Sequence, residues 1–237
     1  MSRIALVTGA SRGIGRAVAR ALAREGWRVI CVARSQKALE ALDDEIRAEG
    51  KGEATLVPLD LRDYDSIDKL GAALYERHGK LDALAACAGA LGQLTPTHQA
   101  TPAMMEETIA VNYLANQRLI RSMHPLLRAS DAGRGVFVTS GVSKNPRAYW
   151  SPYAASKAAL DALVACYAQE VAITPIKVNL FNPGPTATAM RARAFPGEDP
   201  NTLPKPDDVA PQLIALLSPD CALNGAWVQF ETAREKH

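Results

Sequence analysis

The sequence predicts one α/β domain, in which helices cover both faces of a doubly wound parallel sheet of about seven strands. Short apolar runs alternate with amphipathic stretches along most of the chain, which is typical of strands joined by right-handed helical crossovers. The first apolar run also passes through a glycine-rich turn into a helical pattern, an arrangement found where such sheets bind ligands. These two observations predict the fold class.

Composition supports one globular domain and narrows the choice of partners. The chain has 237 residues, of which 48% are hydrophobic and 22% charged, as expected for a globular protein with a full core. The formal net charge is +2 and Lys and Arg form no concentrated patch, so we expect neither nucleic acid nor a membrane as a partner. The apolar runs also fall short of the roughly 18 residues of a membrane span.

The cysteines and the start of the chain indicate where the protein works. The four cysteines are scattered without the spacing of a disulfide framework or a zinc site, so no metal is expected. The chain enters its first apolar run almost at once, so we expect no signal peptide. A reducing cytoplasm fits both observations best.

The first half of the chain is expected to form four strands and three helices. Each predicted strand is a short apolar run, and each predicted helix has an amphipathic period. Glycines stop the first two helices, at Gly26 and Gly50. We expect strands at residues 4–7, 29–33, 55–59 and 81–86, and helices at residues 16–26, 37–49 and 65–78.

The second half is expected to add two long helices, a short one and three strands. The second long helix should have Ser151 as its N-cap and Pro152 as its first residue. Residues 185–206 are rich in Pro, Ala and Thr, and we expect a mobile loop there that acts as a lid over a ligand site. We expect helices at residues 101–128, 152–171 and 207–217, and strands at residues 134–139, 176–181 and 227–230.

The glycine turn after the first strand has the composition of a phosphate-binding loop. Gly9, Gly13 and Gly15 follow a G-x-x-x-G-x-G spacing. Glycine lets a backbone approach a pyrophosphate closely, and the helix that follows offers unpaired N–H groups and the positive end of its dipole. Because strand, turn and helix all fit, we predict a dinucleotide site rather than a glycine turn without phosphate chemistry.

Two arginines indicate which dinucleotide binds. Arg34 follows the second strand, about 20 positions beyond the glycines, where an acidic residue would bind the ribose 2′-hydroxyl of NAD. Arg12 lies within the glycine turn. Because a guanidinium pairs well with a phosphate, the two arginines predict the 2′-phosphate of NADP(H). The alternative is that Arg34 is a solvated strand end.

Two later strand ends are also expected to meet the cofactor. Asp60 and Leu61 follow the third strand, and the Asp60 carboxylate should either accept a hydrogen bond from the adenine amino group or cap the next helix. Ala88 and Gly89 follow the fourth strand, where small residues let the loop pass close to a bound molecule.

Tyr153 and Lys157 form a candidate acid/base pair near the start of the helix at residues 152–171. Positions i and i+4 share one face of a helix, so the phenol and the ammonium group should be neighbours. A nearby cation should lower the pKa of a phenol from its usual value of about 10. Ser140, at the end of the strand at residues 134–139, should lie at the same edge of the sheet. The alternative is an ordinary helix surface, because a motif this short occurs by chance.

Taken together, these features resemble the short-chain dehydrogenase/reductase (SDR) family over nearly the whole chain, with a Rossmann-like sheet. The order and spacing of the motifs carry the resemblance, since each motif alone is weak. The matching motifs are Thr8-Gly9-x-x-x-Gly13-x-Gly15, Asn112 in the first long helix, Ser140 thirteen residues before Tyr153, Lys157 four residues after it, and Asn182-Pro183-Gly184 followed by Thr188.

The resemblance implies a role for each matching residue. Tyr153 would be the acid/base, and Ser140 would orient and polarise the carbonyl or hydroxyl group. Lys157 would hold the ribose and lower the pKa of the tyrosine, while Asn112 would fix a water molecule that relays protons to Lys157. The residues expected to contact the cofactor are Gly9, Ser11, Arg12, Gly13, Ile14, Gly15, Arg34, Asp60, Leu61, Ala88, Gly89, Tyr153, Lys157, Pro183, Gly184 and Thr188.

The implied activity is that of an NADP(H)-dependent oxidoreductase, which moves a hydride between the nicotinamide and a carbonyl or secondary-alcohol substrate. One alternative is a 3-oxoacyl-carrier-protein reductase, in which Arg191 and Arg193 would meet phosphopantetheine or an acidic carrier surface. Another is a non-catalytic NADP-binding sensor or scaffold. Members of the family usually pair through their two long helices, so a homodimer or homotetramer is expected.

Two segments depart from the family's pattern. Ala86-Cys87-Ala88-Gly89 stands where the family usually has Asn-Asn-Ala-Gly, whose amides tie down neighbouring strand ends. Phe230-Glu231-Thr232 replaces an Asp-Gly-Gly that often shapes the substrate pocket or subunit contacts. Just before the catalytic helix, Tyr149 and Trp150 are expected either to form an aromatic pocket wall or to pack into the core.

Overall fold

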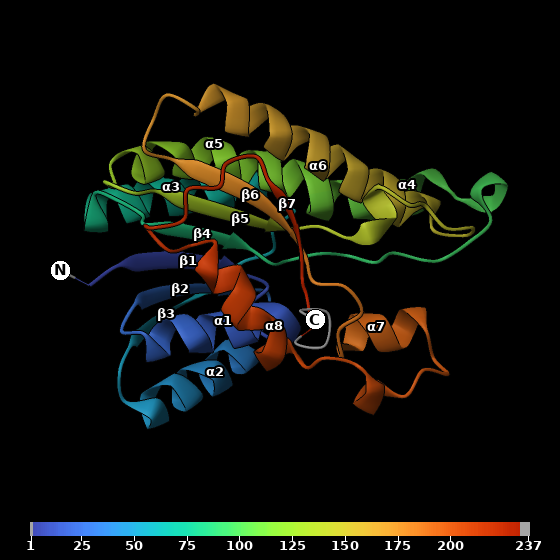
Figure 1. Cartoon of the computed structure of the whole chain (residues 1–237), viewed down its shortest axis with the longest axis horizontal. Helices are drawn as coiled ribbons and strands as arrows, with labels where there is room; N and C mark the ends of the chain where they lie inside the picture. Colours follow the sequence, from blue (N-terminus) through green and yellow to red (C-terminus); the bar gives the residue numbers. More distant parts are fainter. Residues whose placement is uncertain (1, 233–237) are drawn as a thin grey trace.

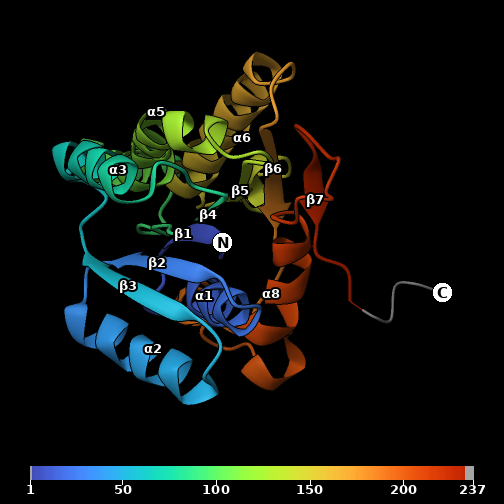
Figure 2. The same ribbon diagram turned by 90° about the vertical axis from the view of Figure 1, so that its left-hand side faces the viewer.

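Seven parallel strands form one sheet with helices on both faces, as Figures 1 and 2 show for the computed structural model. The strand order is β3-β2-β1-β4-β5-β6-β7, so the chain winds outward from β1 to one edge, returns to β4 and winds outward to the other edge. The predicted fold class is confirmed. The structure describes residues 2–232, and the remaining residues of the expected domain at 1–237 lie outside that part.

The strands begin and end within a few residues of the predicted positions. The central strands are buried because they have neighbours on both sides and helices on both faces, whereas the edge strands β3 and β7 are partly exposed. The strands are β1 (Ile4–Thr8), β2 (Arg28–Ala33), β3 (Glu53–Pro58), β4 (Ala83–Ala86), β5 (Arg134–Val138), β6 (Lys177–Asn182) and β7 (Trp227–Gln229).

Each face of the sheet has its own helices and its own hydrophobic core. On one face lie α1 (Gly13–Arg24), α2 (Gln36–Glu49) and α8 (Pro206–Ala215), which pack on a core that includes Leu22 and Leu39. On the other face lie α3 (Tyr64–His78), α5 (Ala115–Arg128) and α6 (Ser151–Glu170), over a core that includes Leu119 and Val164. The short helices α4 (Pro102–Ile109) and α7 (Ala189–Ala194) lie toward the carboxyl ends of the strands (Figure 1).

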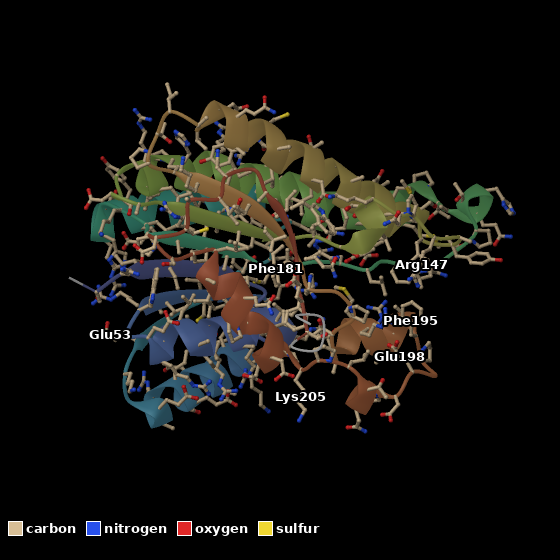
Figure 3. The ribbon with its side chains drawn as sticks, viewed as in Figure 1. Glu53, Arg147, Phe181, Phe195, Glu198 and Lys205 are labelled. Carbon is tan, nitrogen blue, oxygen red and sulfur yellow. The ribbon has the colours of Figure 1, made fainter. Side chains whose placement is uncertain are left out.

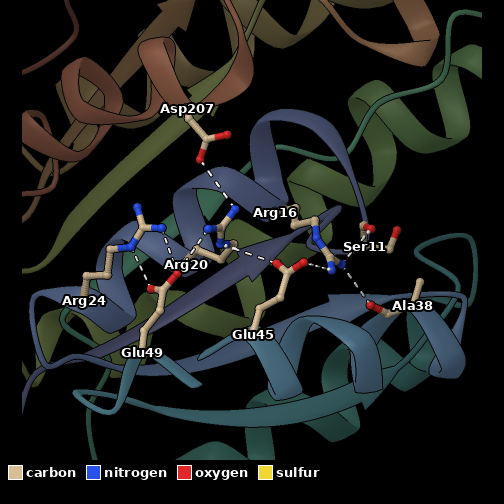
Figure 4. A network of polar contacts seen from close by, with 8 residues as sticks. All are labelled: Ser11, Arg16, Arg20, Arg24, Ala38, Glu45, Glu49 and Asp207. Atoms are coloured by element: carbon tan, nitrogen blue, oxygen red, sulfur yellow. Dashed lines mark hydrogen bonds and ion pairs between the residues drawn. The ribbon is translucent and has the colours of Figure 1, made fainter. Parts of the chain in front are cut away.

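Ion pairs join the helices of the first face, as Figure 4 shows. Arg20 contacts Glu45 at 3.4 Å, Glu49 at 3.1 Å and Asp207 at 3.7 Å, so it links α1 to both α2 and α8. Arg24 pairs with Glu49 at 2.6 Å. Because these side chains are partly exposed, each pair adds little stability, and the network mainly fixes how the three helices sit together.

Two predicted helices differ in detail from the structure. The helix expected at residues 101–128 consists of α4, a π-helical turn η2 (Ala110–Leu114) and α5. Helix α6 begins one residue earlier than predicted, with Trp150 at the N-cap position, because the Ala154 N–H donates to the Trp150 carbonyl at 2.8 Å. The expectation that Ser151 caps α6 is therefore wrong, and its buried hydroxyl has no hydrogen-bond partner among the described residues.

The segment expected to be a loop at residues 185–206 contains regular structure. The Thr188 hydroxyl accepts a hydrogen bond from the Arg191 N–H at 3.2 Å and so caps α7. A short 3₁₀ turn, η4 (Pro200–Thr202), follows. An irregular loop is therefore wrong for residues 189–194, while the mobility of the segment stays a prediction.

The described residues were also compared with the requirements of a membrane span and of a metal site. None of the helices within residues 2–232 combines the length and the hydrophobicity that a membrane span requires. In the same residues, His, Cys, Asp and Glu form no group of three or more that could hold a metal ion. All four cysteines are free thiols.

Candidate active site

A cavity of about 560 Å³ opens at the carboxyl ends of the strands. It extends across the point between β1 and β4 at which the winding of the sheet reverses, the usual ligand position in such folds. Every residue predicted to contact the cofactor lines this cavity. They are Gly9, Ser11, Arg12, Gly13, Ile14, Gly15, Arg34, Asp60, Leu61, Ala88, Gly89, Tyr153, Lys157, Pro183, Gly184 and Thr188.

The glycine turn after β1 forms a cradle that side chains would fill. A Cβ on Gly9, whose φ is +67°, would lie 2.9 Å from the Ala88 Cα. A Cβ on Gly15 would lie 2.5 Å from the Gly9 carbonyl oxygen. Within the described chain no side chain caps the start of α1, so its first N–H groups are available to an anion. The turn therefore fits the pyrophosphate of a dinucleotide.

Arg12 and Arg34 lie exposed on the wall of the cavity. Arg16 connects the two segments that carry them, since its Nη1 donates to the Ser11 carbonyl at 3.4 Å and to the Ala38 carbonyl at 3.2 Å (Figure 4). The glycine turn and the start of α2 are thereby held side by side. Two guanidinium groups at this end of the cavity fit a further phosphate on the adenosine ribose.

A third arginine, Arg62, lies beside them on the cavity wall. It pairs with Asp60 at 2.6 Å, and this hydrogen bond holds the pKa of the Asp60 carboxyl below its usual range. The cap of α3 is Asp63, which accepts a hydrogen bond from the Ser66 N–H at 3.0 Å. The expectation that Asp60 caps this helix is therefore wrong, because the N-cap position lies three residues further along the chain, at Asp63. Contact of Asp60 with adenine stays a prediction.

The loop after β4 is tied down although it lacks the family's two asparagines. The Ala88 N–H donates to the Thr8 hydroxyl at 3.2 Å, which joins this loop directly to the end of β1. Cys87 takes part in the cavity wall. At the other departure, the Phe230 N–H donates to the Asn182 carbonyl at 2.8 Å, so the chain after β7 stays docked on β6.

Ser140, Tyr153 and Lys157 meet at the wall of the cavity. Ser140 follows β5, whereas Tyr153 and Lys157 lie in the first turns of α6 and are almost fully buried. The Lys157 Nζ donates to the Val138 carbonyl at 2.8 Å and lies 5.9 Å from the centre of the Tyr153 ring. The phenol of Tyr153 and the ammonium group of Lys157 are therefore neighbours, as predicted.

Burial decides the protonation states of this pair. It raises the pKa of Tyr153 to about 12, against a hydrogen bond with Ser140 that lowers it. It lowers the pKa of Lys157 to about 8, against the charge of Asp161, which raises it. The expectation that Lys157 lowers the pKa of Tyr153 is wrong in this structure, because desolvation dominates and the ammonium group is directed at Val138. At neutral pH the phenol keeps its proton and the amine is charged.

Asn112 lies behind the cavity wall in the π-helical turn and is fully buried. Its Oδ1 accepts from the Ala90 N–H, and its Nδ2 donates to the Ala90 carbonyl and to the Ser156 hydroxyl, each at 2.8 Å. The amide points inward, because the backbone of the loop after β4 and the Ser156 hydroxyl satisfy it. A role in a proton relay to Lys157 stays a prediction.

Trp150 forms an aromatic wall beside Tyr153. Its ring lies 6.0 Å from the Tyr153 ring in an edge-on arrangement and 5.6 Å from the Phe195 ring, which follows α7. Tyr149, by contrast, is 60% exposed, has a φ of +72° and lies outside the cavity. Trp150 therefore lines the pocket, whereas Tyr149 neither lines it nor packs into the core.

The two arginines of α7 have different surroundings. Arg191 pairs with Glu198 at 2.6 Å, and its guanidinium stacks 3.7 Å from the centre of the Phe195 ring. Figure 3 shows Phe195 and Glu198 at the end of the molecule where α7 lies. Arg193 donates to the Gly92 carbonyl at 3.4 Å. Both arginines line the cavity, and Arg191 also supports the aromatic contact between Phe195 and Trp150.

Several cavity residues escaped the sequence analysis. Val32 and Val138 lie at strand ends, and Val111 and Met190 lie on the helical segments that border the cavity. For Val32, Val138 and Val111 the sequence offered a signal, because the two former residues lie at strand ends and Val111 is next to Asn112. For Met190 and Arg62 it offered none, because their positions depend on how α7 and the loop after β3 fold.

A dinucleotide cradle that shares its cavity with a buried phenol and ammonium group is typical of an enzyme of oxidation and reduction, in which a bound cofactor carries the hydride. Comparisons with known proteins agree. Residues 3–199 match the family described as short chain dehydrogenase. The oxidoreductase YciK of Escherichia coli (strain K12), itself called uncharacterized, is 38% identical over 220 residues, which are 92% of this chain and 87% of YciK.

Solved structures give the same answer. A short chain dehydrogenase of Shigella flexneri, complexed with NADP, is 35% identical and has a TM-score of 0.90 over 96% of each chain. One from Escherichia coli CFT073, complexed with NADPH, is 36% identical and has a TM-score of 0.90 over 96% of this chain and 95% of that one. The chain belongs to the short-chain dehydrogenase family and is an oxidoreductase.

Proposed function

We propose that the protein is an NADP(H)-dependent oxidoreductase that interconverts a carbonyl compound and the corresponding alcohol, with Tyr153 as the acid/base. The position of the protonated Tyr153 phenol beside Ser140, in the cavity that holds the phosphate cradle, carries this proposal. When bound, the nicotinamide would supply or accept the hydride.

Two observations support NADP(H) rather than NAD(H). Arg12 and Arg34 line the end of the cavity beside the glycine turn, and Arg16 holds their two segments together. Solved relatives from Shigella flexneri and Escherichia coli were complexed with NADP and NADPH.

The side chains around the cavity have different roles in proton transfer and in substrate binding. In the reductive direction Tyr153 donates its proton to the substrate oxygen, and Ser140 hydrogen-bonds the same oxygen. Lys157 carries its charge below a pH of about 8, where it favours negative charge on a neighbouring oxygen and can donate to a ribose hydroxyl. Trp150 and Met190 give this part of the cavity apolar walls, which exclude water and favour substrates with an apolar substituent.

The alternatives have less support. A 3-oxoacyl-carrier-protein reductase would use Arg191 and Arg193, but Arg191 is paired with Glu198 and stacked on Phe195, which leaves Arg193 alone for that contact. A non-catalytic sensor would have no need of the complete set of Ser140, Tyr153 and Lys157. A cytoplasmic location stays a prediction from the free cysteines.

A homodimer or homotetramer is part of the proposal. Up to residue 166 the exposed face of α6 carries small, uncharged side chains, which allow close approach of a second copy, while Gln169 and Glu170 are exposed at its C-terminal end. The residues concerned are Ala155, Ala158, Ala162, Ala165 and Cys166. Light scattering is expected to give at least twice the mass of one chain, and a stable monomer at micromolar concentration contradicts this proposal.

Tyr153→Phe is expected to lower kcat by roughly 10²–10⁴-fold, because it removes the proton donor but keeps the ring. NADPH binding, followed by the change in its fluorescence, is expected to persist because the cradle and the arginines are unchanged. Tyr149→Phe serves as the control, since Tyr149 is exposed and outside the cavity. Full activity of Tyr153→Phe would overturn the assigned role.

Arg34→Ala is expected to lower kcat/KM for NADPH by roughly 10–100-fold, which corresponds to the loss of one charge-assisted hydrogen bond. The kcat/KM for NADH should stay unchanged. Arg47→Ala is the matched control, because Arg47 is an exposed arginine of α2 that pairs with Asp43. Steady-state kinetics with NADPH and with NADH measure the two kcat/KM values. Equal losses for NADPH and NADH would contradict recognition of the 2′-phosphate.

Trp150→Ala is expected to lower kcat/KM roughly tenfold or more for carbonyl compounds with an aromatic or branched substituent, because the wall of the pocket is lost. Small aldehydes, which do not reach the wall, should be affected much less. Tyr149→Ala is the control and should leave the preference unchanged. An equal loss for small and large substrates would show that Trp150 acts on Tyr153 and not on the substrate.

A further inference from the structure

Asp161 connects the catalytic helix to both flanks of Ser140. It lies on α6, four residues after Lys157 and therefore on the same helix face. Its Oδ1 accepts a hydrogen bond from the hydroxyl of Thr139, the residue before Ser140. Its Oδ2 lies 2.6 Å from the hydroxyl of Ser143, three residues after Ser140. One carboxylate thus holds the turn on both sides of the catalytic serine.

The carboxylate is the preferred acceptor for Ser143. The Ser143 Oγ lies 2.6 Å from Asp161 Oδ2 and 2.8 Å from the Ser140 carbonyl oxygen, yet a hydroxyl has one proton to donate. A charged acceptor forms the stronger hydrogen bond, so the proton goes to Asp161. Trp227 of β7 adds a third donor, with its Nε1 at 3.1 Å from the same oxygen.

Asp161 also supplies negative charge to the buried ammonium group. Lys157 is almost fully buried, and the groups that act on its charge are Asp161, one turn along α6, and Cys87 from the loop after β4. Burial raises the pKa of the Cys87 thiol to about 12, so this group is neutral at neutral pH. Tyr153, the other titratable neighbour, is neutral as well. Asp161 is therefore the charged group that opposes the desolvation of Lys157.

We propose that Asp161 is a positioning residue, which holds the Ser140 turn in register with Tyr153 and provides the negative charge that faces Lys157. This inference rests on the proposed function. It assigns Asp161 two separable effects, one through hydrogen bonds and one through charge. The hydrogen bonds act on kcat, since Ser140 and Tyr153 must reach the same substrate oxygen. The charge acts on the alkaline limb of the pH profile of kcat, which is the range where kcat falls as the pH rises, because Lys157 must keep its proton.

Asp161→Asn tests both effects. Loss of the charge lowers the pKa of Lys157 below its present value of about 8, so the alkaline limb of kcat should move to lower pH. The kcat at the optimum should fall roughly tenfold or more, as expected when a reacting group is displaced, with KM for NADPH little changed. Asp161→Glu, which keeps the charge, should restore the position of the alkaline limb even where its kcat stays low.

Ser143→Ala separates the two effects. It removes one hydrogen bond and leaves the carboxylate in place, so kcat should fall while the alkaline limb stays where it is. This variant also keeps the proposal testable if Asp161→Asn fails to fold.

Asp82→Asn is the matched control for a purely structural effect. The Asp82 carboxylate likewise accepts three hydrogen bonds, from the Ile4 N–H at 2.9 Å, Lys80 at 2.8 Å and the Ser130 hydroxyl at 2.6 Å. It lies at the opposite end of the sheet from the cavity, at the start of β4. The variant should lose stability in thermal unfolding and keep the pH profile of the wild type.

Two results overturn the proposal. One is an Asp161→Asn enzyme with the kcat and alkaline limb of the wild type; the other is an equal shift of the limb in Asp82→Asn. Either result leaves the proposed function intact, provided that the wild-type enzyme oxidises NADPH with a carbonyl substrate. Failure of the wild type with every carbonyl compound would overturn the proposed function and this inference together.

Discussion

The buried ammonium group of Lys157 is the interaction on which the arrangement of the site depends. Its hydrogen bond of 2.8 Å to the Val138 carbonyl joins α6 to the end of β5, so Tyr153 on the helix and Ser140 after the strand come to the same wall. Burial of a charge costs free energy, and for this reason the pKa of Lys157 is lowered to about 8. The nearby carboxylate of Asp161 offsets part of it and holds the same turn from the other side.

Much of the fold and of the cavity could be predicted from the sequence, because both depend on local patterns. Apolar runs that alternate with amphipathic stretches gave the strands and helices within a few residues. The glycine spacing located the cradle because Gly9 and Gly15 occupy places where a Cβ would collide with backbone. A parallel sheet brings its strand ends to one edge, which is why residues as distant as Arg34 and Gly184 line one cavity.

What could not be predicted depends on burial and on non-local partners. The i, i+4 spacing showed that Tyr153 and Lys157 share a helix face, but the sign of each pKa shift depends on the competition between desolvation and charge, which spacing does not contain. Asn112 points inward because Ala90, far away in the sequence, satisfies its amide. Asp161 was overlooked since its donors come from the turn around Ser140 and from β7.

We expect NADPH to bind in this cavity and to reduce a carbonyl compound there. The most direct measurement is NADPH oxidation, followed by absorbance, across aldehydes, ketones, quinones and 3-oxoacyl thioesters, with NADH in parallel. We predict oxidation of NADPH with at least one carbonyl compound and a much slower reaction with NADH. An enzyme that binds NADPH yet oxidises it with none of these compounds, or that prefers NADH, would contradict this expectation.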